Sequence, residues 1–424
     1  MTWDRGTIGR RAVRAAMLAG LLVLGAAGTA RAQIAVRGGK VYTMTGPPIE
    51  DGVVVIRDGK VAAVGRAADV RVPDDFRLLE AAFVVPGLID THSVVGLAGA
   101  LNYRHDQEQL DGSEPIQPEL RALDAYNARE TLVDWVRGFG VTTFHTGHAP
   151  GALVSGQTMI VKTRGETIDE AVLVPRAAVA VTLGEDARRG EKESPGTRGK
   201  MAAMLRQTLV GAREYAERRR LEDAEKVPPR DLRLEVLGEV LRGELPLLVT
   251  AHRAQDVATA LRIAEEFGVR IILDGGAEAY LVADRLASAN VPVILHPPMA
   301  RYRGDLENAS FESAAKLKEL GLRVALQSGY ESYVPKTRVV LFEAAIAAAY
   351  GMAFEDALAT ITVDAARILG IDDRVGSIAV GKDGDLALYD GDPFEYTTHC
   401  TATIIEGEVV SEGERQRETR EREL

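Results

Sequence analysis

The chain has 424 residues, of which 46% are hydrophobic, and a formal net charge of −11. That length exceeds one ordinary hydrophobic core, so we expect either two domains or one large barrel with additions. The acidic balance argues against a nucleic-acid partner. The single cysteine, Cys400, excludes an internal disulfide and a four-cysteine zinc site.

Residues 1–32 have the pattern of a secretory signal peptide. Four arginines, at positions 5, 10, 11 and 14, precede an apolar run that extends from Ala15 to about Gly28, and Ala30-Arg31-Ala32 is a small-x-small cleavage site. The pattern predicts cleavage after Ala32 and a periplasmic or secreted location. The pair Arg10-Arg11 leaves twin-arginine export open beside the general secretory route. No later stretch approaches the ~20 uninterrupted apolar residues that a bilayer needs, so no membrane span is predicted.

Short strands separated by turns are predicted at both ends of the chain. Near the N-terminus, apolar bursts are split by Gly-Gly, Gly-Pro-Pro and Asp-Gly, of which Asp58-Gly59 is the clearest hairpin turn. The sequence near the C-terminus has the same pattern of short apolar stretches, separated by Gly-Lys-Asp-Gly and Glu-Gly turns. We therefore expect residues 33–85 and 372–412 to form one small β-sandwich built from both chain ends.

The middle of the chain alternates strand and helix patterns. Four strand-helix units follow one another between Leu245 and Gly351, and the first helix ends at Gly268, a typical C-cap. Three earlier strand candidates bring the count near eight. The predicted fold class is therefore α/β, with a (β/α)8 TIM-type barrel over 86–371. The charged stretch of about 186–242 is interpreted as a helical insertion, and residues 413–424 as a solvated tail.

Seven motifs spread over nearly the whole chain after residue 33 carry a family resemblance. They are VVPGLIDTHS, GVTTFHTGHAPG, SGQTMIVK, AHRAQDVATALRIAEEFGVRIILDGGAEAY, VALQSG, ITVDAARILGIDDRVGS and AVGKDGDLALYDGDP. The chain thus resembles the amidohydrolase superfamily, in particular its exported imidazolonepropionase-like and prolidase-like branch. The resemblance implies a split β-sandwich with a (β/α)8 barrel. It also implies hydrolysis of C–N bonds other than ordinary peptide bonds, or of peptide-like bonds to proline.

The resemblance further implies one or two divalent metals at the carboxyl end of the barrel. In such enzymes the ligands are a His-x-His pair on the first strand, a bridging carboxylate from Lys or Glu on a middle strand, and one histidine after each of strands five and six. An aspartate after strand eight completes the set and serves as general base. A catalytic zinc needs at least three protein ligands and then lowers the pKa of its bound water.

Most of these positions hold other residues here. The first pair reads His92-Ser93-Val94, so Val94 replaces one histidine. The family's His-Ala-His reads Thr250-Ala251-His252, and its Glu-His-Gly reads Asp274-Gly275-Gly276. Strand eight ends Gln327-Ser328-Gly329, where Ser or Thr followed by Asp is expected. Val has no lone pair, Gly has no side chain and Thr is a weak neutral ligand, so the resemblance predicts loss of the binuclear site and of its base.

Two ligand positions stay in register with the family, namely His92 and, by its Leu-Gly-Glu context, Glu185. Three other histidines, His145, His148 and His296, end barrel strands and are expected to point toward the mouth. With His92 they either form a relocated metal site or fill space and bond to loops.

Other polar positions also leave two interpretations open. Glu185 either bridges a metal or pairs with Arg188 or Arg189. His252 and Arg253 either hold an anion or cap a helix. Lys162 is interpreted as a solvated side chain. Gly275, Gly276 and Gly329 predict a pocket wider than that of an active relative.

Two functional hypotheses follow. In the first, the chain is a catalytically impaired amidohydrolase homologue that acts as a binding or partner subunit, as a homo-oligomer, with an active homologue, or with a small-molecule ligand. In the second, it is an active hydrolase of cyclic amide, N-acyl or dipeptide-like substrates, with a relocated or mononuclear site that holds zinc or another divalent metal. No catalytic residue is assigned under either hypothesis.

Overall fold

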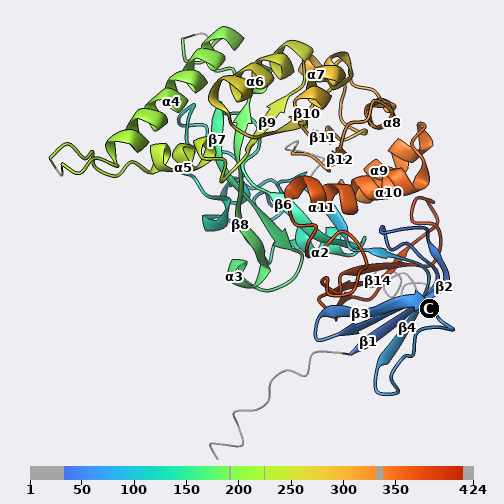
Figure 1. Ribbon diagram of the computed structural model, residues 1–424. Helices are drawn as coiled ribbons and strands as arrows, with labels where there is room; N and C mark the ends of the chain where they lie inside the picture. The colour runs from blue at the N-terminus through green and yellow to red at the C-terminus, as the bar shows by residue number, and fades with distance from the viewer. Residues whose placement is uncertain (1–32, 191, 224, 331–337, 414–424) are drawn as a thin grey trace, which may run out of the picture.

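The computed structural model describes residues 33–413 except residues 191, 224 and 331–337 (Figure 1). The predicted signal peptide over 1–32, and all but the first residue of the predicted tail, lie outside the described residues. The described chain forms an eight-stranded barrel sheet with helices around it and a separate seven-stranded sheet. Among the described residues, no helix combines the length and apolar character needed to cross a bilayer.

The barrel strands are neighbours in chain order from β5 to β12, and all run parallel except β7. A parallel bridge between Ser93 and Gly329 joins β12 back to β5. The predicted α/β barrel fold class is therefore confirmed. The strands are β5 (Leu88–Ser93), β6 (Val141–Thr146), β7 (Val154–Lys162), β8 (Val172–Thr182), β9 (Leu247–Ala251), β10 (Ile271–Gly275), β11 (Val293–Leu295) and β12 (Val324–Leu326).

The antiparallel β7 is a departure from a strict strand-helix repeat. Only residues 147–153 connect β6 to β7, and 163–171 connect β7 to β8. A parallel crossover needs about a dozen residues or more, so these connections can only make hairpins.

The helices surround the barrel (Figure 1). Within 186–242, α4 and α5 place Leu205, Leu209 and Val236 in the same apolar core as Leu247 of β9, so this stretch supplies the helical layer between β8 and β9. The α-helices are α2 (Thr131–Arg137), α3 (Ile168–Ala171), α4 (Arg198–Arg218), α5 (Leu232–Leu241), α6 (Ala254–Phe267), α7 (Ala283–Ser288), α8 (Ser313–Glu319), α9 (Val340–Ala349), α10 (Phe354–Thr360) and α11 (Val363–Leu369). The 3-10 helices are η1 (Arg104–Asp106), η2 (Ala122–Asp124), η3 (Glu185–Ala187), η4 (Ala279–Val282) and η5 (Gly304–Leu306).

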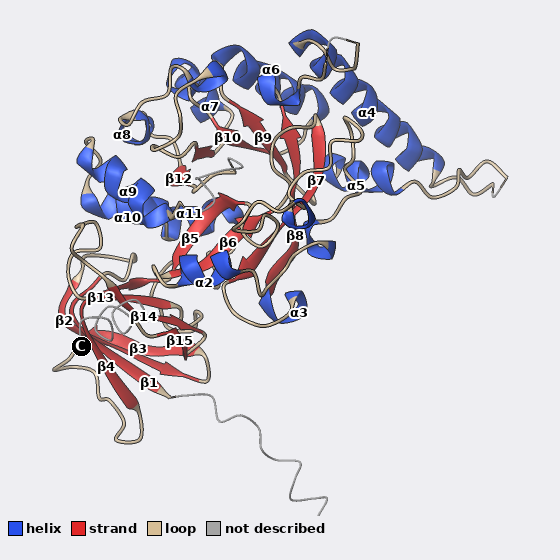
Figure 2. Cartoon of the chain, turned by 180° about the vertical axis from the view of Figure 1, so that it is seen from behind, coloured by secondary structure: helices blue, strands red, loops and turns tan. Residues whose placement is uncertain are grey.

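The second sheet combines both ends of the described chain, as expected (Figure 2). Its strand order is β15-β14-β13-β4-β1-β2-β3, and antiparallel pairing of β13 with β4 joins the two sequence segments. Val54 and Ile56 from one segment share a core with Leu386 and Ile404 from the other. The strands are β1 (Ile34–Val41), β2 (Ile49–Arg57), β3 (Lys60–Arg66), β4 (Arg77–Pro86), β13 (Leu386–Tyr389), β14 (Cys400–Ile405) and β15 (Glu408–Ser411).

A buried ion cluster joins the barrel to this second sheet. The Lys162 ammonium at the end of β7 lies 2.6 Å from Asp383, 3.0 Å from Asp385 and 2.9 Å from Glu406. Burial alone lowers the pKa of Lys162, but the three carboxylates raise it above its usual value. The interpretation of Lys162 as a solvated side chain is therefore wrong, because this cation stabilises the contact between the two units.

Helix α11 packs against the amino end of the barrel. Ala365, Ala366 and Ile368 of this helix pack with Ile89 and Leu248, which point into the barrel from its strands. The interior next to this helix is therefore apolar. The buried polar side chains described below lie at the opposite, carboxyl end of the barrel.

Candidate functional site

Four polar side chains meet at the carboxyl end of the barrel. The Asp274 carboxylate of β10 accepts hydrogen bonds from His92 Nδ1 at 3.0 Å, from Thr250 Oγ1 at 2.6 Å and from Gln327 Nε2 at 2.8 Å. His92 lies on β5, Thr250 pairs directly with Asp274 in the β9–β10 register, and Gln327 follows β12. All four residues are buried. We call this group the Asp274 network.

The network keeps Asp274 ionised. Burial alone raises the pKa of this carboxyl, but His92 and the three hydrogen bonds outweigh burial and hold the pKa below its usual value. An ionised carboxylate only accepts hydrogen bonds, so the proton of the His92 contact is on Nδ1. Within the described residues, His92 Nε2 has no hydrogen-bond partner. Thr250 stands at an expected ligand position, and Gln327 begins the altered Gln327-Ser328-Gly329 stretch; both side chains donate to Asp274.

His145 lies beside His92, with ring centroids 5.9 Å apart. Its Nδ1 donates to the Thr91 carbonyl at 2.8 Å, and its Nε2 accepts from the Thr158 hydroxyl at 2.6 Å. Burial lowers the pKa of His145 to about 4, so the ring is neutral at pH 7. Both nitrogens are engaged with the barrel wall, which favours the space-filling interpretation of this histidine.

The His252 ring occupies the room beside Gly275. A Cβ at Gly275 would lie 2.5 Å from His252 Cε1, and the φ of Gly275 is +88°, so this position requires glycine. A Cβ at Gly329 would lie 2.8 Å from Cγ of Pro297. At Gly275 and Gly329, neighbouring rings therefore occupy the space that a larger side chain would need.

Val94 is buried in a small apolar cluster near the mouth. It packs with Ala98 and Ala149, and the partly buried Leu110 and Tyr330 cover the cluster. The Tyr330 ring also lies 5.1 Å from the His92 ring, and its hydroxyl is 3.5 Å from His252 Nε2. An apolar contact thus stands where the family resemblance placed a second metal-binding histidine.

The two remaining mouth histidines are also buried. His296 Nδ1 donates to the Pro297 carbonyl at 2.9 Å, and burial lowers the pKa of His296 to about 4. His148 lies close to Gly156, where a Cβ would come 2.5 Å from its Nε2, and burial lowers its pKa to about 4 as well. Both rings are therefore neutral at pH 7.

Glu185 and Arg253 each form ion pairs with neighbouring side chains. Glu185 is half-exposed in its side chain and pairs with Arg188 at 3.3 Å, which favours the ion-pair interpretation. The Arg253 guanidinium contacts Glu278 at 2.9 Å and Glu307 at 2.7 Å. Arg253 therefore has carboxylate partners of its own, which argues against its holding an anion with His252.

Comparison with known proteins identifies the family. The sequence profile of the Amidohydrolase family, Amidohydro_3, matches residues 348–411. The crystal structure of an amidohydrolase from Thermotoga maritima MSB8 is similar with a TM-score of 0.84 and 31% identity, over 89% of this chain and 100% of that one. The chain belongs to the amidohydrolase family.

Other amidohydrolase relatives are more distant. The imidazolonepropionase of Solibacter usitatus is 24% identical over 408 residues, which are 84% of this chain and 91% of that protein. Amidohydrolase tasK of Hapsidospora irregularis is 28% identical over 298 residues, 58% of this chain, and this match spans only 29% of the relative's length.

Amidohydrolases usually bind a divalent metal, but the donors at this mouth do not fit one. Among the described residues, no three His, Cys, Asp or Glu side chains form a group that could hold a metal ion. Of the Asp274 network, Thr250 and Gln327 present donors, and both carboxylate oxygens of Asp274 already accept hydrogen bonds. The relocated site of His92, His145, His148 and His296 is therefore not supported within the described residues.

Sequence reasoning missed the central position of Asp274. It noted Asp274-Gly275-Gly276 only as a departure from Glu-His-Gly, and Gln327-Ser328-Gly329 only as a departure from Ser or Thr followed by Asp. A signal was present, because a carboxylate and three polar partners end neighbouring barrel strands and such ends converge. Which of them would meet could not be read from spacing alone.

The Asp274→Asn substitution should destabilise the fold. An amide NH2 would face hydrogen-bond donors, and the charge that holds them would be lost, so we expect the free energy of unfolding to fall by about 3 kcal/mol. Urea denaturation measures this loss. Asp69→Asn, at an exposed position, is the matched control and should stay within about 0.5 kcal/mol of the wild type. Equal stability of both variants would contradict the importance of the network.

A fall in pH should destabilise the protein at pH values above those at which most of its carboxylates gain protons. The pKa values of His145, His148 and His296 are lowered to about 4 in the folded protein. Between pH 6.5 and 4 these side chains therefore bind more protons in the unfolded state than in the folded state. The free energy of unfolding falls as the pH falls through this range. Asp90, whose pKa burial raises to about 6, opposes this trend with one proton. The free energy of unfolding should fall by about 4 kcal/mol from pH 7.5 to 5.

Urea denaturation at the two pH values measures this loss. His296→Asn should remove about 2 kcal/mol of the pH dependence, whereas Gln255→Asn, at an exposed position, should leave it unchanged because neither side chain titrates. An equal free energy of unfolding at pH 7.5 and pH 5 would show that the buried rings are protonated in the folded state.

Proposed function

We propose that this amidohydrolase homologue is catalytically impaired and acts as a binding or partner subunit. The observation that carries the proposal is the Asp274 network. A catalytic metal centre gathers lone pairs around a cation, whereas this site gathers three hydrogen-bond donors around an anion. A metal that entered here would have to displace donors from a buried carboxylate, and hydrogen bonds to charged groups contribute about 1.5–3 kcal/mol each.

The end of β12 supports the same proposal. A hydrolase of this family needs a carboxylate there to accept a proton from the attacking water. Gln327 is a neutral amide whose nitrogen donates to Asp274, and the Ser328 N–H donates to Asp90 at 3.0 Å. Neither side chain is a general base at neutral pH.

The proposal includes an exported protein with a partner. Its support for export is the signal-like pattern of residues 1–32. The partner would be a second copy of this chain, an active homologue or a small molecule. Retention of the fold beside loss of the ligand set is the reason to expect binding without turnover.

Metal content and turnover test the proposal together. The full chain, purified without chelator and offered zinc, manganese and iron, should hold less than about 0.1 metal per chain by plasma mass spectrometry, because no group of three ligands converges among the residues that the structure describes. It should not hydrolyse cyclic amides, N-acyl amino acids or dipeptides that end in proline.

A matched pair of variants makes the result specific. His92→Asn keeps a nitrogen donor toward Asp274 but removes Nε2, and His399→Asn is its exposed control. The proposal fails if the wild type holds about one metal per chain, turns over one of these substrates, and loses both in His92→Asn but not in His399→Asn.

A further inference from the structure

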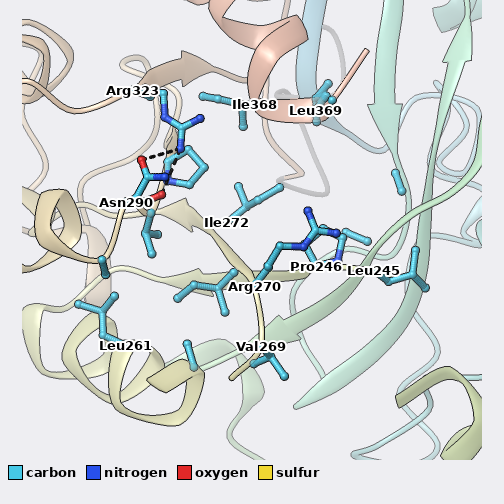
Figure 3. Close-up of a pocket in the computed structure, with 18 of the residues that line it drawn as sticks. Leu245, Pro246, Leu261, Val269, Arg270, Ile272, Asn290, Arg323, Ile368 and Leu369 are labelled. Carbon is cyan, nitrogen blue, oxygen red and sulfur yellow. Dashed lines mark hydrogen bonds between the residues drawn. The ribbon is translucent and has the colours of Figure 1, made fainter. Parts of the chain in front are cut away.

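A cavity of about 1070 Å³ opens at the amino end of the barrel, opposite the Asp274 network (Figure 3). Its lining includes residues that precede three successive strands, namely Pro246 before β9, Arg270 before β10 and Pro292 before β11. Ile368 and Leu369 of α11 form another part of the wall, and the lining reaches inward to His145. The volume is close to the upper end of the range of about 300–1,000 Å³ that is usual for sites holding small organic ligands.

The inner wall of the cavity is apolar. Ile272 and Ile368 each retain 7% exposure, whereas Leu248 and Ile294, which share their core cluster, are fully buried. The residual exposure belongs to side chains that line the cavity. Burying such surface against an apolar ligand is favourable.

The rim of the cavity carries unbalanced positive charge. Arg270 donates to the Gly243 carbonyl at 2.8 Å, and Arg323 donates to the backbone and side-chain oxygens of Asn290 at 3.1 Å. In the part of the chain that the structure describes, neither guanidinium has a carboxylate within ion-pair distance. Both are exposed, unlike Arg253, whose charge carboxylates neutralise.

The five arginines of the lining outnumber its three acidic residues, although the whole chain has a net charge of −11. Its arginines are Arg176, Arg270, Arg285, Arg323 and Arg367, and its acidic residues are Glu244, Glu265 and Asp284. Arg176 and Arg367 have carboxylate partners outside the lining, Glu239 and Asp364, and Glu244 pairs with Arg242. The lining thus retains Arg270, Arg285 and Arg323 beside Glu265 and Asp284, so it favours an anion more than the acidic chain as a whole does. Figure 3 shows Arg270 and Arg323 among the residues around this space, with Ile272 and Ile368.

We propose that the cavity binds a small amphipathic organic anion. Its carboxylate would contact Arg270 and Arg323, which suit planar anions, and its apolar body would lie against Ile272 and Ile368. The proposal goes beyond the proposed function and does not depend on it, because none of the four residues of the Asp274 network lines the cavity.

Isothermal titration of the full chain with octanoate tests the proposal. Octanoate should bind saturably at one per chain, while acetate, which lacks the apolar body, and octanol, which lacks the charge, should each bind at least tenfold more weakly. The double variant Arg270→Gln with Arg323→Gln should weaken octanoate at least tenfold and change octanol less than twofold. Arg262→Gln, an exposed arginine of α6 outside the lining, is the control and should bind octanoate as the wild type does.

Absence of saturable octanoate binding, or equal octanoate affinity of the double variant and the wild type, would overturn the proposal. A crystal soaked with 8-bromooctanoate gives a readout that needs no variant. Its anomalous bromine peak should lie beside Ile272 and Ile368, and a peak only elsewhere would also overturn the proposal. His92→Asn should bind octanoate normally, so a failure here and a failure of the proposed function are distinguishable.

Discussion

Three hydrogen-bond donors converge on one buried carboxylate, Asp274. The arrangement of the polar side chains at the carboxyl end of the barrel depends on these three hydrogen bonds. Asp274 would be costly to bury without His92, Thr250 and Gln327, since an unpaired charge in the barrel is strongly destabilising. His92 and Thr250 stand at positions that the family resemblance assigns to metal ligands, and Gln327 lies in the altered stretch that follows strand β12. Under the proposed function, the hydrogen bonds that stabilise this end of the barrel use the same side chains that a metal would need.

The fold could be predicted from the sequence because its signals are local and repeated. Gly268 ends α6 in the left-handed conformation, as its position predicted, and the turn-rich chain ends pair through β4 and β13 in one sheet. The departure at β7 was also encoded, since the connections on both sides are too short for a crossover. That constraint becomes visible only when strand ends are placed within a residue or two.

The candidate site was harder to predict because contacts between side chains from distant strands decide it. The sequence revealed which ligand positions are altered, but not that His252 fills the room beside Gly275 or that Asp274 collects three donors. Lys162 illustrates the same limit. Its three carboxylate partners lie more than 200 residues away along the chain, so a buried ion cluster looked like a solvated lysine.

Anomalous diffraction at the zinc edge, from crystals grown with excess zinc, tests the central claim most directly. We expect no zinc peak at the mouth of the barrel and an Asp274 carboxylate that still accepts hydrogen bonds from His92, Thr250 and Gln327. A zinc peak about 2.0–2.1 Å from His92 Nε2, with Asp274 turned away from its donors toward the metal, would contradict it.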